Sequence, residues 1–145
     1  MSTQENVQTV KDFFAAMGGE RRSLLALCTE DIEWTIPGKD WPLAGTYRGH
    51  AGLSDLLQKA SDTMETTVMG HREFVAQSDR VMVLGFAAGK IKSTGRSWED
   101  DWVFAFTVRN GKVASIREYV DTQALARAAE KSAGPASELV ATESK

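Results

Sequence analysis

Residues 97–120, SWEDDWVFAFTVRNGKVASIREYV, consist of two alternating runs separated by Asn110-Gly111. Alternation with a period of two is typical of β-strands, because successive side chains point to opposite faces of a sheet. Asn-Gly favours the type I′ turn that joins two antiparallel strands. We therefore predict strands at about 97–109 and 112–121 that pair as a hairpin.

The alternation extends upstream of this hairpin and predicts two more strands, at about 66–77 and 80–92, connected by short turns. Before them, apolar residues recur every three or four positions, which is helical spacing. From the N-terminus we expect a helix at about 2–17, a short helix at 20–27, a turn at 29–31, a strand at 32–36, a loop at 39–49 and a helix from 50 onward. A last helix is expected from 121 or 122 to about 131.

Helices followed by a run of antiparallel strands indicate an α+β fold, in which the amphipathic helices cover one face of the sheet. No repeat and no long linker divides the chain. We therefore expect one domain at 1–131 and a flexible C-terminal tail at 132–145.

The bulk composition excludes several classes of function. The 145 residues carry a net charge of −3 without a Lys/Arg cluster, which argues against a nucleic-acid partner. No apolar run is long enough to span a membrane, no leader-like segment begins the chain, and the single Cys28 fits a reducing compartment. Nucleotide-binding glycine motifs and metal-ligand spacings are absent, so we expect a cytoplasmic protein without cofactor or metal.

Several short segments resemble the SnoaL-like branch of the nuclear-transport-factor-2-like (NTF2-like) superfamily. They are WTIPG at 34–38, PLAGTYRGH at 42–50, NGKV at 110–113 and REYVDT at 117–122. The expected order of elements is also similar to the cone-shaped fold of ketosteroid isomerase and SnoaL-type polyketide cyclases. The resemblance covers roughly residues 4–130. It implies helices on a strongly curved sheet around an apolar pocket, and a homodimer formed through the outer face of the sheet.

Strand parity indicates which side chains face such a pocket. In the strand at 97–109, Asp100 shares a face with aromatic residues, namely Trp98, Trp102, Phe104 and Phe106. An acid among aromatic side chains has a raised pKa and is a candidate catalytic group. Alternatively, Asp100 lies at the frayed start of the strand and is solvated.

Glu118 is the second candidate acid, because it shares a face of the last strand with Ile116 and Val120. The match of Arg117-Glu118-Tyr119 to limonene-epoxide hydrolases suggests a catalytic base at Glu118. A glutamate held in a structural hydrogen-bond network is the alternative.

The chain departs from both related enzymes. The positions that align with the Arg and Asp of the epoxide hydrolases fall near Gly85 and Ala87, which cannot orient an epoxide. The first helix carries Phe13 and Phe14 and lacks the tyrosine of the ketosteroid isomerase oxyanion hole. Neither reaction is therefore expected.

The predicted function is the binding of a small apolar or aromatic molecule, with cofactor-free acid–base chemistry of the isomerase, cyclase or hydratase/hydrolase type at Asp100 and Glu118. The alternative is a non-catalytic ligand-binding or dimeric assembly module. Asp40 and His71 are open candidates for the site, and Cys28 is expected to be a buried apolar residue. The predicted substrate-binding residues are Trp34, Trp41, Tyr47, His50, Trp98, Trp102, Phe104, Ile116 and Val120.

Overall fold

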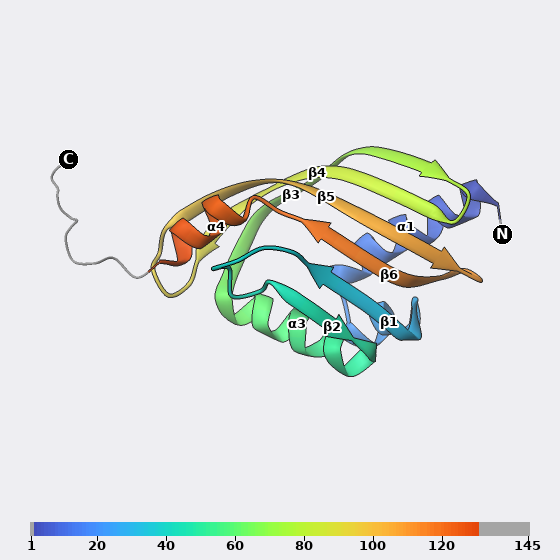
Figure 1. Cartoon of the computed structure of the whole chain (residues 1–145), viewed down its shortest axis with the longest axis horizontal. Helices are drawn as coiled ribbons and strands as arrows, with labels where there is room; N and C mark the ends of the chain where they lie inside the picture. Colours follow the sequence, from blue (N-terminus) through green and yellow to red (C-terminus); the bar gives the residue numbers. More distant parts are fainter. Residues whose placement is uncertain (1, 131–145) are drawn as a thin grey trace, which may run out of the picture.

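The computed structural model describes residues 2–130, so the predicted tail at 132–145 lies outside the described residues. The strands form one six-stranded sheet in the order β2-β1-β6-β5-β4-β3, and four helices accompany it (Figure 1). The helices are α1 (Thr3–Met17), α2 (Arg21–Ala26), α3 (Gly49–Thr63) and α4 (Thr122–Ala129). The strands are β1 (Cys28–Ile36), β2 (Gly45–Arg48), β3 (Met64–Gln77), β4 (Arg80–Ile91), β5 (Ser97–Arg109) and β6 (Lys112–Tyr119).

The antiparallel run from β3 to β6 confirms the predicted strands to within two residues at each end. Asn110 and Gly111 both have positive φ, 52° and 77°, as the predicted type I′ turn requires. The sheet is mixed because β1 pairs parallel to β6, with Trp34 opposite Ile116.

Two predictions for the N-terminal half were wrong. The residues at 29–31, expected to turn, belong to β1, whose pairing with β6 shifts register between Cys28 and Glu33. The irregular pairing explains why alternation fails there. The expected loop also contains β2, a short polar strand that pairs with β1 at the edge of the sheet. Its four residues are too few for a periodic signal.

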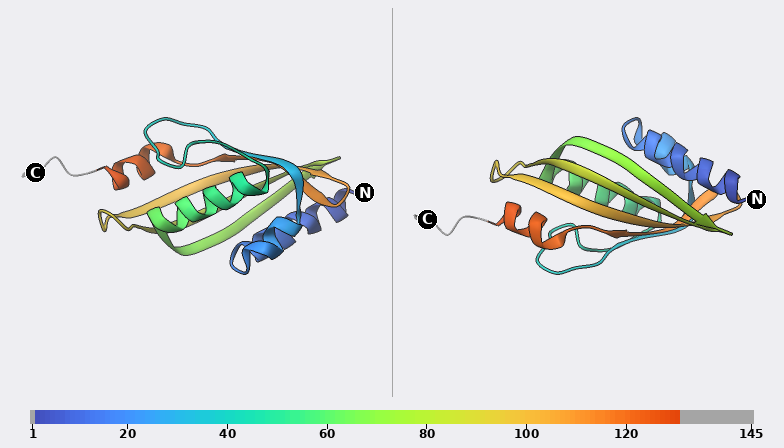
Figure 2. Two further views of the ribbon diagram at one scale, coloured as in Figure 1. Left: turned by 90° about the horizontal axis from the view of Figure 1, so that it is seen from below. Right: turned by 90° about the horizontal axis from the view of Figure 1, so that it is seen from above.

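The helices lie on the concave face of the sheet. Helix α3 contacts β1 and β2 at one edge and β3 at the other, which means that the sheet curves around it (Figure 2). Helix α1 begins with the capping box of Ser2 and Glu5 and packs against β3 to β6. Within residues 2–130, no helix is long and apolar enough to cross a membrane.

An aromatic cluster fills the space between α1 and the sheet. Phe13 of α1 lies 5.5 Å from Phe106 and 5.8 Å from Trp34 between ring centroids, and Phe14 lies 5.4 Å from Phe104. All five side chains are at least 93% buried. This end of the cone is therefore solid core, and the open space lies toward α3 and α4.

Candidate functional site

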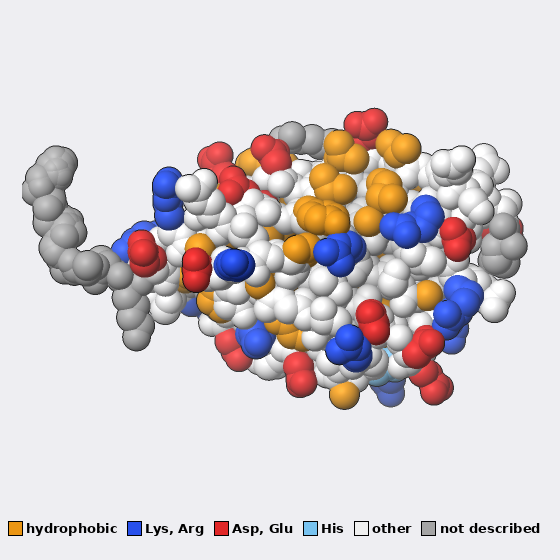
Figure 3. Space-filling view, viewed as in Figure 1, with side chains coloured by type: hydrophobic (Ala, Val, Ile, Leu, Met, Phe, Trp, Pro, Cys, Tyr) orange, Lys and Arg blue, Asp and Glu red, His pale blue; other side chains and the backbone are white. Residues whose placement is uncertain are grey.

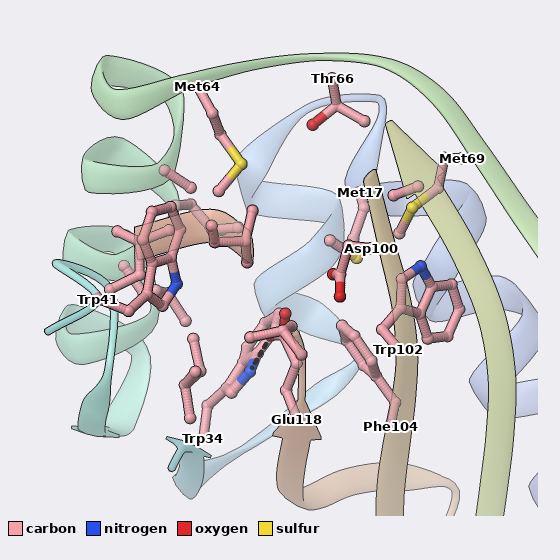
Figure 4. Close-up of a pocket in the computed structure, with 18 residues that line it drawn as sticks. Met17, Trp34, Trp41, Met64, Thr66, Met69, Asp100, Trp102, Phe104 and Glu118 are labelled. Atoms are coloured by element: carbon pink, nitrogen blue, oxygen red, sulfur yellow. Dashed lines mark hydrogen bonds between the residues drawn. The ribbon is translucent and has the colours of Figure 1, made fainter. Parts of the chain in front are cut away.

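A cavity of about 140 Å³ lies between α3 and the concave face of the sheet (Figure 4). Most of its wall is apolar: α3 contributes Leu56, Leu57 and Ala60, and the segment before β2 contributes Trp41 and Leu43. Asp100 and Glu118 are the only ionisable side chains among the described residues of the lining. The cavity therefore presents two acids against a hydrophobic wall.

Glu118 enters the cavity from β6 and is anchored by the neighbouring strand. Trp34 of β1 donates its indole Nε1–H to Oε1 of Glu118 at 2.9 Å. Burial raises the pKa of Glu118 to about 8; the Trp34 hydrogen bond opposes the rise and the negative charge of Asp100 adds to it. A pKa of about 8 favours the protonated form of Glu118 at neutral pH.

Asp100 enters the cavity from β5 and is only 5% exposed. Its Oδ1 accepts a hydrogen bond from the backbone N–H of Asp121 at 2.7 Å. Asp121 is the N-cap of α4, where its own carboxyl accepts from the N–H of Ala124 at 3.0 Å. Asp100 is therefore held by the start of α4, and the alternative of a solvated residue at a frayed strand end was wrong.

Burial also raises the pKa of Asp100, to about 6. The hydrogen bond from Asp121 opposes the rise, whereas the charges of Asp121 and Asp101 add to it. Figure 4 shows the Asp100 and Glu118 carboxyl groups directed toward the same part of the cavity. Because the pKa of Asp100 lies below neutral pH and that of Glu118 above it, the site combines a proton acceptor with a proton donor near neutral pH.

Four predicted aromatic residues line the cavity together: Trp34, Trp41, Trp102 and Phe104. Val120, also predicted, lines it beside them. The Trp102 ring lies directly over Gly85 of β4, where a Cβ atom would collide with it. Gly85, which cannot supply the polar side chain of an epoxide hydrolase, therefore makes room for the indole ring of Trp102 in the cavity wall.

Four predicted binding residues lie outside the lining. Tyr47 donates its hydroxyl to the carbonyl oxygen of Leu43 at 2.8 Å, and His50 lies 3.2 Å from the carbonyl oxygen of Cys28. Ile116 and Trp98 are 2% and 5% exposed and belong to the core. Parity correctly assigned Ile116 and Trp98 to the inner face, but it could not show which part of that face adjoins the cavity.

The open candidates also lie elsewhere. His71 stacks on Phe14 at 4.2 Å between ring centroids, and partial burial lowers its pKa. Asp40 is exposed in a loop with φ of 62°. Cys28 is 1% exposed and burial raises its pKa to about 12, as expected for an inert thiol. Among the described residues, no three His, Cys, Asp or Glu side chains are grouped so that they could hold a metal.

No sequence pattern predicted the residues at the mouth of the cavity. Met17, Met64, Thr66 and Met69 line the cavity where β3 passes the ends of α1 and α3, and Met69 is 43% exposed. These positions belong to two elements, α1 and β3, that lie far apart in the sequence, so no single pattern joins them. Flexible methionine side chains at a mouth adapt to a passing molecule at low energetic cost.

Residues 10–116 match the family model described as the SnoaL-like domain. The chain is similar to the solved structure of an NTF2-like protein from Burkholderia xenovorans LB400, with 65% identity, 90% of this chain and 99% of that chain covered, and a TM-score of 0.81. It is also similar to an NTF2-like protein from Burkholderia thailandensis E264 (25% identity, 90% and 100% covered, TM-score 0.80). TerC, co-crystallised with polyporic acid, is a further similar structure (27% identity, 88% and 99% covered, TM-score 0.74). No curated protein matches the chain.

The curved sheet and the cavity beneath it define the class of the fold, an NTF2-like cone. The chain belongs to the SnoaL-like domain family of the NTF2-like superfamily, which is a small-molecule-binding family.

Proposed function

We propose that the protein is a cofactor-free acid–base enzyme that acts on a small apolar or aromatic molecule held in the cavity. The observation that carries the proposal is the pair of carboxyl groups, buried Asp100 and half-buried Glu118, within an otherwise apolar wall. Enzymes use such environments to separate the pKa values of two acids and so to assign them different roles. The similarity to TerC, co-crystallised with polyporic acid, supports an aromatic ligand.

The pKa values suggest how the roles divide. Near pH 7 the Asp100 carboxylate is mainly ionised and can accept a proton, while Glu118 is protonated and can donate one. In an isomerisation, Asp100 removes a proton from the carbon beside a carbonyl group as Glu118 protonates the carbonyl oxygen. Asp100 then delivers its proton to a different carbon while the enol O–H returns its proton to Glu118, which restores the carbonyl group and both carboxyl groups without any cofactor. This division reverses the role that the resemblance to epoxide hydrolases suggests for Glu118.

The proposal is tested by proton exchange, which needs no knowledge of the product. Small ketones are incubated with the protein in D₂O, and deuterium incorporation beside the carbonyl is followed by NMR. We expect the wild type to catalyse exchange and the variants Asp100→Asn and Glu118→Gln to lose about 10²–10⁴-fold of the rate. The control Glu99→Gln, an exposed residue on the same strand, keeps the wild-type rate.

The rival function is a non-catalytic ligand-binding module. It is supported if ketones bind in the cavity and no exchange above the background occurs with any of them. Equal exchange rates in the wild type and in Glu118→Gln would refute the role of Glu118 alone.

We also propose that two copies of this cytoplasmic protein associate through the outer face of the sheet. Leu84 and Tyr119 lie on that face, and both pair in register with Val103 on the strand between them. Val68 and Val75, which lie nearby, are each 50% exposed. Figure 3 shows hydrophobic side chains gathered on this surface. Contiguous exposed apolar patches mark association surfaces. Sedimentation of the wild type at micromolar concentration is expected to give a dimer, and Leu84→Glu a monomer; a monomeric wild type would refute the proposal.

A further inference from the structure

The size of the cavity limits its ligand. An engineered protein cavity of about 150 Å³ holds one benzene molecule, and the cavity of this protein is about 140 Å³. Its opposite sides are closed by Trp41 and Leu56 and by Trp102 and Phe104, which are all at least 96% buried. A single six-membered ring therefore fits, whereas a fused pair of rings requires movement of the core.

The charge of the ligand is limited by the composition of the wall. The described residues that line the cavity include no Lys, Arg or His, so an anionic ligand finds no counter-ion there. Charge in a hydrophobic wall carries a desolvation penalty, and the penalty applies to a ligand as it does to Asp100 and Glu118. An uncharged ligand avoids this penalty.

The polar groups define how many oxygen functions the ligand carries. Trp34 occupies Oε1 of Glu118, and the backbone of Asp121 occupies Oδ1 of Asp100. The remaining oxygen of each carboxyl is available to the ligand, and the buried indole N–H of Trp102 has no hydrogen-bond partner among the described residues, while Thr66 lies exposed at the mouth. One ligand oxygen accepts a hydrogen bond from the protonated Glu118 carboxyl or from the Trp102 N–H, and further oxygens would face the apolar part of the wall without partners.

We infer that the cavity takes an uncharged compound with one six-membered ring and one oxygen function, such as a cyclic ketone, and excludes fused-ring and anionic analogues. This inference rests on the proposed function, since it names the class of molecule on which the two carboxyl groups act. It goes further by setting limits of size and charge that the fold class does not impose.

The experiment compares three probes that share a saturated ring: cyclohexanone, cyclohexanecarboxylate and decalone. Calorimetric titration at about pH 7 is expected to show cyclohexanone binding at least tenfold more tightly than the other two. Tighter binding of the carboxylate would show an anion site, and equal binding of decalone would remove the size limit; either result overturns the inference, as does the absence of cyclohexanone binding.

Enlarged cavities provide a second arm of the test. Trp41→Ala and, independently, Leu57→Ala remove wall volume, and at least one is expected to bind decalone at least tenfold more tightly than the wild type does. Leu57 is only half-buried, so its replacement is compatible with folding even if Trp41→Ala is not. Decalone affinity unchanged in both folded variants would locate its binding elsewhere and contradict the size argument.

Binding and exchange separate the two proposals. Glu118→Gln keeps an oxygen for Trp34 and supplies an N–H donor, so it should bind cyclohexanone within about threefold of the wild type. Cyclohexanone binding without exchange refutes the proposed function and leaves the ligand class intact. Exchange that occurs only with fused-ring ketones refutes the ligand class and leaves the function intact.

Discussion

Glu118→Gln provides a quantitative test of the buried acid through the pH dependence of stability. The folded protein holds the pKa of Glu118 at about 8, above its ordinary value of 4.5. Between these values the unfolded chain has released the proton and the folded chain retains it, so the free energy of unfolding falls as pH rises. At about 1.4 kcal/mol per pH unit, wild-type stability should decrease by about 2 kcal/mol from about pH 6.5 to about pH 9.

The pH window separates Glu118 from Asp100. Most of the Asp100 contribution is lost between its ordinary pKa of 3.8 and about 6, below the window. Gln cannot ionise, so the free energy of unfolding of Glu118→Gln should stay constant over the pH window in which that of the wild type declines. Urea unfolding of both proteins at several pH values measures the two free energies of unfolding. Subtracting one from the other at each pH cancels the contribution of groups that both proteins share, such as His71. Parallel curves for the two proteins would refute the assignment of Glu118 as a buried neutral acid.

Two further substitutions test the surroundings of the acids. Trp34→Phe removes the indole donor, so the pKa of Glu118 should rise beyond about 8. The midpoint of the decline in stability should therefore move to higher pH. An unchanged midpoint would contradict the role of the hydrogen bond. Gly85→Ala places a methyl group against both the Trp102 ring and the backbone carbonyl oxygen of Gly70, which should destabilise the fold by at least about 1–3 kcal/mol in urea unfolding and weaken ligand binding by displacing the ring. The matched control is Gly70→Ala, whose new Cβ has its nearest neighbour at 3.9 Å; equal losses in both variants would refute the steric argument.

Much of the architecture was predictable because its signals are local. Alternation and the Asn110-Gly111 turn predicted the hairpin of β5 and β6, and the helical spacing of apolar residues predicted α1. The short edge strand β2 and the irregular start of β1 escaped prediction, because β2 is stabilised by pairing with a distant segment and not by its own pattern.

The candidate acids were predictable for the same reason. Parity alone placed Asp100 and Glu118 on the inner face of their strands, since the pleat fixes the direction of every second side chain. The same argument could not distinguish Trp102, which lines the cavity, from Trp98, which lies in the core. Both share a face, and they differ only in what packs above them.

The sequence by itself thus determined an α+β domain with a long antiparallel run and two acids on its inner face. Only the tertiary structure decided that these acids meet in one cavity and that Trp34 and the N–H of Asp121 anchor them. The physical reason is that periodicity reports the direction of a side chain relative to its own strand. The depth of burial, and hence the raised pKa of Glu118, depends on the curvature of the sheet and on helices from distant parts of the chain.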